Sequence, residues 1–338
     1  MTYTLRHGAP LFLILSTCNA SIAQTEIAPQ GAAFHQTIDD AWWTGPLLAA
    51  SPATLPPGHF LVEPYVYDSM VDGQFDSTGA RHRTARDSEF GSQSYVLYGV
   101  TDRVTVGIIP RIAYSEPSQG EGSTSVGLGD LTAQAAYRLS RFLDEGWLPA
   151  TSIVLGETLP TGRYDRLGDR AGDGLGAGAY TTTVSLYSQY YLWMPNGRLL
   201  RTRLDVSQSW SNEVQLRDTS VYGTAPGFRG YARPGNSLII DSAWEYSVTQ
   251  RWVAALDVVF DTAGSTQVAG IQPQPQNGGL TWTPIHSGSG STRSLGLAPA
   301  AEFNWSANAG VIVGVKFVAA GHNTAAAVIP IAAVNLVF

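Results

Sequence analysis

The chain has almost no cysteine or lysine, and no long apolar run follows its first segment. Cys18 is the only cysteine and Lys316 the only lysine in 338 residues. A single cysteine cannot form an intramolecular disulfide or a thiolate metal site. Beyond residue 23, no stretch has the roughly 18 consecutive apolar residues expected of a transmembrane helix. If the chain spans a membrane, it must therefore do so as a closed barrel, because only helices and barrels satisfy every backbone polar group in lipid.

Positive charge is also scarce. The formal net charge is −7 at pH 7. Nucleic-acid-binding surfaces are basic, so this balance argues against nucleic acid as a partner.

Residues 1–23 have the features of an export signal. Arg6 precedes a mostly apolar run from Ala9 to Cys18, and the small residues Ala20-Ser21-Ile22-Ala23 follow. Small residues at the third and first positions before a cut suit signal peptidase, so we expect cleavage after Ala23, which would leave the mature chain without any thiol. The alternative is lipoprotein processing, since Leu15-Ser16-Thr17-Cys18 loosely resembles a lipobox.

The other end of the sequence favours an outer-membrane protein. The last residues are Val334-Asn335-Leu336-Val337-Phe338, and alternate positions place Phe338, Leu336 and Val334 on one face of a strand. A last strand with a terminal aromatic residue resembles the signal that the bacterial barrel-assembly machinery reads. The alternative is an ordinary last strand that happens to end in phenylalanine.

Residues 24–57 differ in composition from the rest. They are rich in alanine and proline, and Pro56-Pro57-Gly58 breaks regular structure. Proline cannot donate to a strand ladder. We therefore expect a non-barrel extension before a barrel that occupies residues 58–338.

From His59 onward the dominant sequence period is two, which is the period of a strand. In Leu200–Trp210, charged and hydroxyl residues at odd positions alternate with a face that carries Leu204, Val206 and Trp210. A soluble sandwich also alternates, but the segments here run for about ten residues, the length of a tilted membrane-spanning strand.

Connections between these segments alternate in length, which also favours a membrane barrel. Thr101-Asp102, Met194–Gly197, Thr249-Gln250 and Ser306-Ala307 are short. Longer, Gly-containing intervals separate the other pairs, as in bacterial barrels with short periplasmic turns and long outer loops. These intervals are Val71–Ser88, Ser115–Val126, Pro160–Ala177, Glu213–Ser237 and Ala263–Thr292.

The predicted fold is all-β: a transmembrane antiparallel β-barrel of about 12 strands with both ends in the periplasm. Trp147, Trp193, Trp252 and Trp305 lie at or beside predicted periplasmic turns, as in an aromatic girdle. The strands are expected at His59–Met70, Phe90–Val100, Arg103–Tyr114, Leu128–Leu139, Ala150–Leu159, Gly178–Leu192, Leu200–Trp210, Leu238–Val248, Arg251–Thr262, Arg293–Asn304, Asn308–Ala319 and Ala327–Phe338.

Motifs for catalysis are missing. The sequence has neither a G-x-S-x-G elbow nor an H-E-x-x-H pair. Outer-membrane phospholipases also have about twelve strands, so strand number alone does not exclude a lipase. The acids of Asp165–Asp173 do not match an EF-hand spacing, and Arg166 and Arg170 would repel a cation. We therefore expect no enzyme activity, no catalytic residue, no metal site and no cofactor.

Charged residues on the inward face are the candidate functional residues. Parity assigns acids and bases in nearly equal number, which predicts either weak ion selectivity in an open lumen or a lattice of ion pairs that fills a narrow barrel. The lumen-lining candidates are Glu63, Arg103, Arg111, Asp130, Gln134, Arg138, Arg201, Arg203, Asp205, Asp241, Glu245, Arg251, Asp257, Glu302 and Lys316.

The extension before the barrel is a candidate plug. Burying Trp42 and Trp43 against the lumen wall would contribute roughly 1.5–3 kcal/mol per side chain before ordering costs. Asp39 and Asp40 could then meet inward arginines such as Arg201 or Arg203. The alternative is a flexible periplasmic tail.

Several short motifs in a fixed order resemble the family described as "putative MetA-pathway of phenol degradation". They are Trp42-Trp43-Thr44-Gly45-Pro46, Gly58-His59-Phe60-Leu61-Val62-Glu63-Pro64-Tyr65, Tyr98-Gly99-Val100-Thr101-Asp102-Arg103, Gly129-Asp130-Leu131 with Tyr137-Arg138, and Leu159-Pro160-Thr161-Gly162. The resemblance implies an outer-membrane barrel linked by name to the uptake of aromatic compounds, with no catalytic residues to transfer.

Two functions remain open from the sequence. One is an outer-membrane channel or transporter of a Gram-negative cell for passive uptake of small, aromatic or hydrophobic compounds. The other is a structural or surface-interaction barrel with a closed lumen. The partners expected in either case are outer-membrane lipid, lipopolysaccharide and the barrel-assembly machinery.

Overall fold

The computed structural model describes residues 35–142, 148–276 and 279–338. The predicted signal peptide with Cys18 and Ala23, the first part of the extension, and Trp147 lie outside the described residues. None of the helices in the described ranges has the length and apolarity to cross a bilayer.

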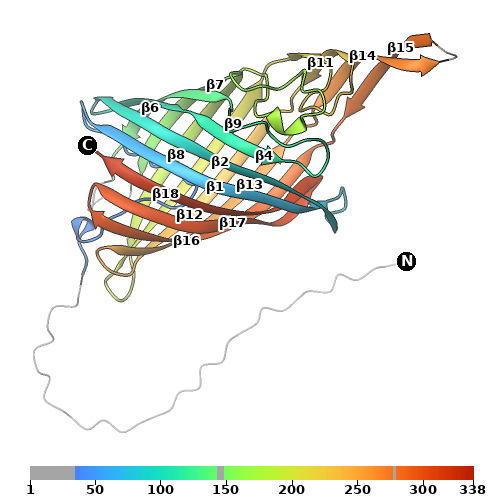
Figure 1. Ribbon diagram of the computed structural model, residues 1–338. Coiled ribbons are helices and arrows are strands. Elements are labelled where there is room, and N and C mark those ends of the chain that lie inside the picture. The colour runs from blue at the N-terminus through green and yellow to red at the C-terminus, as the bar shows by residue number, and fades with distance from the viewer. Residues whose placement is uncertain (1–34, 143–147, 277–278) are drawn as a thin grey trace, which may run out of the picture. The chain divides into compact units, whose positions relative to one another are not determined.

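The main body is a closed antiparallel barrel of 12 strands, as the alternating sequence predicts (Figure 1). Two of the 12 strands are interrupted: β3 and β4 are separated at Pro110, which has no N–H to donate, and β5 and β6 at Gly129-Asp130. The barrel elements are β1 (Phe60–Phe75), β2 (Arg81–Thr101), β3 (Val104–Ile109), β4 (Arg111–Glu116), β5 (Gly127–Leu128), β6 (Leu131–Ser140), β7 (Ala150–Leu159), β8 (Thr181–Trp193), β9 (Leu199–Ser211), β12 (Ser237–Ser247), β13 (Trp252–Ala263), β16 (Thr292–Ser306), β17 (Ala309–His322) and β18 (Thr324–Val337).

The barrel closes because β1 pairs with β18 on one side and with β2 on the other. At the seam, Phe60 and Phe338 exchange both backbone hydrogen bonds, at 3.1 and 2.9 Å. No barrel strand is left with an open edge, which is the condition for a sheet to lie in lipid.

The outer surface of the barrel is apolar. Its middle carries exposed aliphatic side chains such as Ile108, Leu155 and Val313. Trp252 and Trp305, which pack against Phe303 on either side, lie at the end of the barrel with the short turns. An aliphatic band bordered by aromatic rings is the surface expected of a membrane barrel.

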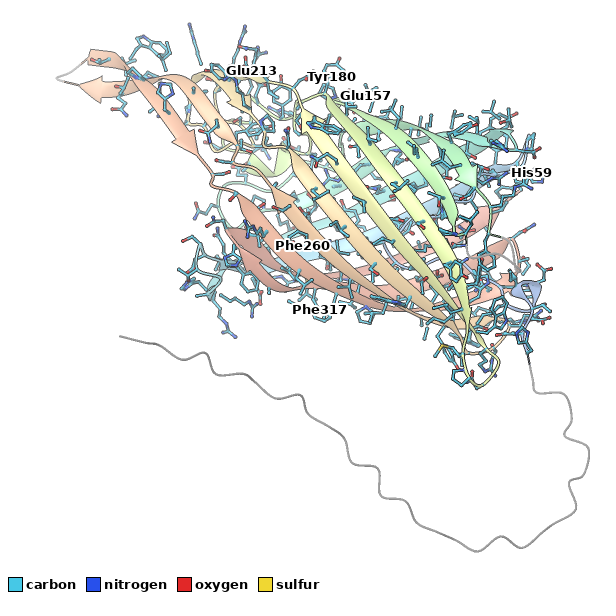
Figure 2. All side chains as sticks on the ribbon, turned by 180° about the vertical axis from the view of Figure 1, so that it is seen from behind. His59, Glu157, Tyr180, Glu213, Phe260 and Phe317 are labelled. Atoms are coloured by element: carbon cyan, nitrogen blue, oxygen red, sulfur yellow. The ribbon has the colours of Figure 1, made fainter. Side chains whose placement is uncertain are left out.

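The barrel has two different ends. We call the end where β1 begins and β18 stops the short-turn end, and the opposite one the long-loop end. Figure 2 shows His59 at the short-turn end and Tyr180 and Glu213 at the long-loop end.

At the long-loop end the sequence predictions were incomplete. The intervals Glu213–Ser237 and Ala263–Thr292, expected as loops, contain a second antiparallel sheet with the order β10-β11-β14-β15. Its strands are β10 (Val214–Arg217), β11 (Arg229–Arg233), β14 (Gln267–Gln276) and β15 (Gly279–Gly288). It projects beyond the barrel (Figure 1).

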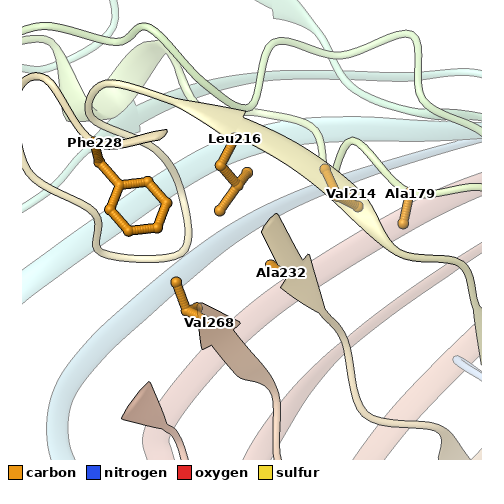
Figure 3. Packing of buried hydrophobic residues seen from close by; sticks show 6 residues of the cluster. All are labelled: Ala179, Val214, Leu216, Phe228, Ala232 and Val268. Carbon is orange, nitrogen blue, oxygen red and sulfur yellow. The ribbon is translucent and has the colours of Figure 1, made fainter. Parts of the chain in front are cut away.

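This second sheet has its own small apolar core. Leu216 from β10, Ala232 from β11 and Val268 from β14 are buried together with Phe228 (Figure 3). β10 and β11 are too short for their period to reveal them, and β14 and β15 are rich in glycine, proline or glutamine, so only the contacts between the strands define the sheet.

Residues 35–59, ahead of β1, have little regular structure. A 3-10 helix, η1 (Ile38–Asp40), is followed by an extended run to β1, and a second one, η2 (Ala171–Asp173), lies in the loop between β7 and β8.

Candidate functional site

The most specific set of contacts in the molecule joins residues 36–55 to the inner wall of the barrel. We call these residues the lumen segment. Leu47 is only 1% exposed. The segment nevertheless does not join the hydrogen-bonded strands of the sheet. Such burial requires other partners for the backbone N–H groups of the segment.

Acidic side chains of the wall provide those partners. Asp257 on β13 accepts hydrogen bonds from the backbone N–H groups of three consecutive residues, Leu47, Leu48 and Ala49, at 3.0, 3.2 and 3.0 Å. Glu302 on β16 accepts from Thr44 and Gly45, at 2.7 and 3.2 Å. Together the two side chains accept five backbone hydrogen bonds from the segment, so they anchor its middle.

Gly45 allows this arrangement by its backbone. Its φ of +126° lies in a region that residues with a Cβ rarely adopt. The turn points two successive N–H groups at one carboxylate oxygen of Glu302.

Further contacts continue along the segment. Asp205 on β9 accepts from the N–H of Ala50 at 2.6 Å, and Arg203 donates to the carbonyl of Ala49 at 2.8 Å. Ser152 donates to the carbonyl of Pro52, and Thr105 accepts from the N–H of Leu55 at 2.8 Å. The segment is therefore bonded to β3, β7, β9, β13 and β16, on several sides of the barrel.

Apolar contacts accompany the hydrogen bonds. Leu47 packs with Ala298 of β16, Ile312 of β17 and Ala333 of β18. Trp43 meets Tyr191 edge to face at 6.2 Å between ring centroids. The guanidinium of Arg201 lies 4.5 Å from the Trp43 ring centroid, a cation–π contact.

The start of the segment is bonded to the short-turn end. Gln36 donates from its amide to Ser247 at 2.8 Å and accepts from the N–H of Leu199 at 3.0 Å. The indole of Trp193 donates to the carbonyl of Gln36 at 2.8 Å. The segment thus enters the lumen beside the β8–β9 turn.

Strand register aligns the inward residues of β8, β9, β12 and β13 in rows. The row nearest the short-turn end, called the first row, contains Tyr191, Arg201, Glu245 and Ala255. The second row contains Gln189, Arg203, Ala243 and Asp257. The third row contains Tyr187, Asp205, Asp241 and Val259. In the first row Arg201 and Glu245 form a bidentate pair, with Nε to Oε2 at 2.7 Å. Arg203 Nε lies 3.5 Å from the same carboxylate.

Many sequence-predicted lining residues lie in or near these rows. Arg201, Arg203, Asp205, Asp241, Glu245, Asp257 and Glu302 are all buried. Glu63 accepts from Asn335 at 3.0 Å, Lys316 reaches over Gly296, and Gln134 is half-buried on β6.

Other predicted lining residues lie elsewhere. Arg103 is exposed in the turn before β3, and Arg251 is exposed before β13 with its guanidinium 5.6 Å from the Trp42 ring. Arg138 bonds the carbonyl of Asp102 at the short-turn rim. Since Arg103 and Arg251 lie at turns and Arg138 lies near the end of β6, the expected balance of charge does not hold within the rows.

The predicted partners of Asp39 and Asp40 were wrong. Both residues are exposed, and Asp40 accepts from the N–H of Thr37 at 2.8 Å instead of reaching Arg201 or Arg203. That backbone hydrogen bond, with a second one from the Thr37 side chain, lowers the pKa of Asp40. The wall carboxylates bind the segment's main chain, a contact that residue types in the segment cannot reveal.

At the long-loop end, Asp130 and Arg111 hold the loop between β7 and β8. Asp130 accepts from the N–H groups of Gly162 and Ala177 at 2.9 and 2.7 Å. Arg111 donates to the carbonyl of Leu175 at 2.9 Å and to Glu89 at 2.5 Å. Both predicted lining residues therefore position a loop rather than line an open pore.

Sequence reasoning missed the small and uncharged residues of the site. Asn304 donates to the carbonyl of Trp42 and accepts from the Thr44 hydroxyl, at 3.1 and 2.9 Å. A Cβ at Gly310 would overlap the same Thr44 hydroxyl. Asn304 shares the parity of Glu302, which was a usable signal, whereas nothing in the sequence distinguishes Gly310 from the other glycines.

An open cavity of about 560 Å³ lies at the long-loop end. It forms where β1 loses its regular register with both neighbours, between Val71 and Gly73. Its wall includes Thr84, Ala85 and Ala325, and residues 117–119 border it. The cavity is thus bordered by β1, β2 and β18 at the long-loop end.

Comparison with known proteins supports this architecture. A family model described as "Putative MetA-pathway of phenol degradation" matches residues 58–325. A crystal structure of an outer membrane channel from Pseudomonas putida F1 matches with a TM-score of 0.64 at 16% identity, over 86% of this chain and 98% of that one. At this identity the likeness shows the fold alone. No curated protein matches the chain.

Two further solved structures are less similar. The β domain of the Bordetella autotransporter BrkA matches with a TM-score of 0.42 at 11% identity, over 83% of this chain and all of that one (100%). The Pseudomonas putida toluene transporter TodX gives 0.35 at 13% identity, over 88% of this chain and 95% of that one. Scores this low carry no argument about function.

Proposed function

The chain belongs to the family described as "Putative MetA-pathway of phenol degradation", and from that membership and the barrel fold we propose that it is an outer-membrane channel. Its solutes would be small aromatic or otherwise hydrophobic compounds, taken up passively. The fold shared with an outer membrane channel supports the location and the transport role.

The observation that carries the proposal is the lumen segment. Asp257 and Glu302 hold it through five backbone hydrogen bonds, all made by side chains of the wall. No strand pairing ties it to the sheet. These contacts support a plug that can leave the lumen while the strands of the barrel stay paired.

The proposed topology follows the two ends of the barrel. Residues 1–23 would direct export and be removed, and residues 24–57 would enter the lumen from the periplasm. Residues 58–338 would form the barrel, with the second sheet outside the cell. The apolar band would face lipid and lipopolysaccharide, and β18 with Phe338 would be recognised by the barrel-assembly machinery of a Gram-negative cell.

The test removes residues 24–57 behind an intact signal and compares single-channel conductance and uptake of phenol with the full chain. A plug predicts larger conductance and faster uptake without it. The matched control replaces residues 24–35, which precede the bonded segment, with a Gly-Ser linker of equal length, and should conduct like the full chain. Identical traces from all three proteins would refute the plug.

A closed barrel with a surface role is the second candidate, and one observation favours it. The projecting sheet exposes Leu280 and Trp282 on β15, at 72% and 46%. Large exposed apolar groups often mark interaction sites. If the deletion leaves the barrel non-conducting while it folds normally, this function replaces the channel.

A further inference from the structure

The third row of the lumen holds two acids that face each other without a basic residue between them. Asp205 of β9 and Asp241 of β12 are directly opposite in register. Like charges in that position repel. The rows below are different, because there Arg201 and Arg203 surround Glu245.

Both side chains are buried and both have an oxygen without a partner. Asp205 is 6% and Asp241 5% exposed. Asp205 Oδ2 accepts from Ala50, but Asp205 Oδ1 and Asp241 Oδ1 have no hydrogen-bond partner among the described residues. A buried unpartnered carboxylate oxygen is costly, and here two of them lie side by side on the inward face.

A cation would supply a partner for both oxygens. Neither Lys316 nor Arg203 supplies it, because within the described ranges no ion pair joins either base to Asp205 or Asp241 at 4.0 Å or less. The Cε of Lys316 lies 3.3 Å from the point where a Cβ on Gly296 would be. Gly296 is opposite Val259, which belongs to the same row as Asp205 and Asp241. Lys316 thus brings positive charge toward the pair and stops short of it.

The donor set fits a monovalent cation better than a divalent one. Calcium takes six to eight oxygens, and no group of three or more acidic or histidine side chains suited to a metal occurs in the part of the chain that the structure describes. Two carboxylate oxygens suit an ammonium group, which has several N–H donors. Tyr187, opposite Asp205 in register, adds an aromatic ring next to the acids.

We propose that Asp205 and Asp241 form a binding site for a monovalent cation in the lumen, next to Ala50 of the plug. The ligand is either an inorganic cation or the ammonium group of an amine-bearing solute. As a step in the passage of solutes, the site rests on the proposed channel function. It gives the pore a preference for cationic over anionic solutes, in contrast to the weak selectivity that a balanced lining predicts.

The experiment measures the thermal unfolding midpoint of the full chain folded in detergent, because a ligand that binds the native state raises it. Potassium chloride, methylammonium chloride and benzylammonium chloride are titrated at constant ionic strength. Tetrapropylammonium chloride, too bulky to meet both oxygens, serves as the balancing salt, and benzyl alcohol is the uncharged control. At least one small cation should raise the midpoint with saturation, and benzyl alcohol should not.

Three variants make the assignment specific. Asp241→Asn should weaken the apparent cation affinity by at least about tenfold, because the cation loses one of its two charged acceptors. Asp261→Asn, which removes an equal charge one row away, should leave the affinity within about twofold. Lys316→Met should strengthen binding, because it removes the competing positive charge.

The arms also identify the source of the ligand. A response to potassium alone assigns an inorganic cation, and a stronger response to the ammonium salts assigns the amine. The proposal would be overturned if every salt gave the same unfolding midpoint as tetrapropylammonium chloride. It would also be overturned if folded Asp241→Asn bound the cation with unchanged affinity. If that variant does not fold, the wild-type titration and Lys316→Met decide. The assay needs no transport, so its result is independent of the uptake assay for the channel.

Discussion

Asp257 should control whether the plug stays in the lumen. Its carboxylate accepts three backbone N–H groups from Leu47, Leu48 and Ala49, and the residue is fully buried. Asp257→Asn keeps the size of the side chain but removes the charge and replaces one acceptor oxygen with an NH₂ group that faces N–H donors. The barrel strands themselves lose no backbone hydrogen bond.

The size of the effect follows from the bonds lost. A hydrogen bond to a charged group contributes about 1.5–3 kcal/mol. The oxygen that remains in asparagine still accepts some of the three N–H groups, so the binding of the plug to the wall should weaken by roughly 2–4 kcal/mol. Because each 1.4 kcal/mol is about a tenfold change in an equilibrium constant, the ratio of open to closed barrels should rise roughly 30-fold or more. Apolar packing of Leu47 in the wall is unchanged and limits the effect.

The assay is open probability in planar bilayers, compared among the full chain, Asp257→Asn and Asp261→Asn. The last variant removes an inward charge that makes no hydrogen bond to the plug among the described residues, so it reports the effect of charge alone. The double variant Asp257→Asn with Glu302→Gln should have an open probability close to that of the protein that lacks residues 24–57. An open probability of Asp257→Asn equal to that of the full chain would refute the anchoring role of these carboxylates.

Three other predictions follow from the same contacts. Gly310→Val should displace Thr44 and increase conductance, because a Cβ at that position overlaps the Thr44 hydroxyl; normal gating would show that the segment is not held there. Glu245→Gln should lower the temperature at which the barrel unfolds in a heat-modifiability assay, since removing one partner of a buried ion pair costs about 3–5 kcal/mol. Glu213→Gln, which removes one partner of a solvent-exposed ion pair, should leave that temperature unchanged. A cysteine at Asp169 should react with an impermeant thiol reagent on whole cells and one at Asn196 should not, and the reverse pattern would invert the proposed topology.

The barrel could be read from the sequence because its lumen and its outer surface differ in polarity. Alternation of two residues is imposed on each strand by the pleat, so each strand reveals itself without its neighbours. The expected Ala150–Leu159 strand agrees with the observed β7, and Leu200–Trp210 differs from β9 by one residue at each end. Prediction failed at the projecting sheet, where β14 and β15 carry glutamine, proline and glycine in place of an alternating pattern.

The lumen residues were predictable only in part. Parity identifies which side chains point inward, and it did so for Arg201, Asp205 and Glu245. It does not give the height of a residue in the barrel, so Arg103 and Arg251 were grouped with the lining although both lie at turns.

The sequence by itself determined the all-β architecture, because the strand period depends only on the order of residues along the chain. Only the tertiary structure decided what the inward acids do. Asp257 and Glu302 bind backbone N–H groups of residues that lie more than 200 positions away in sequence, and every residue but proline carries such a group. Strand register, which depends on pairing between distant segments, also set Asp205 opposite Asp241, and neither acid forms an ion pair with a base among the described residues.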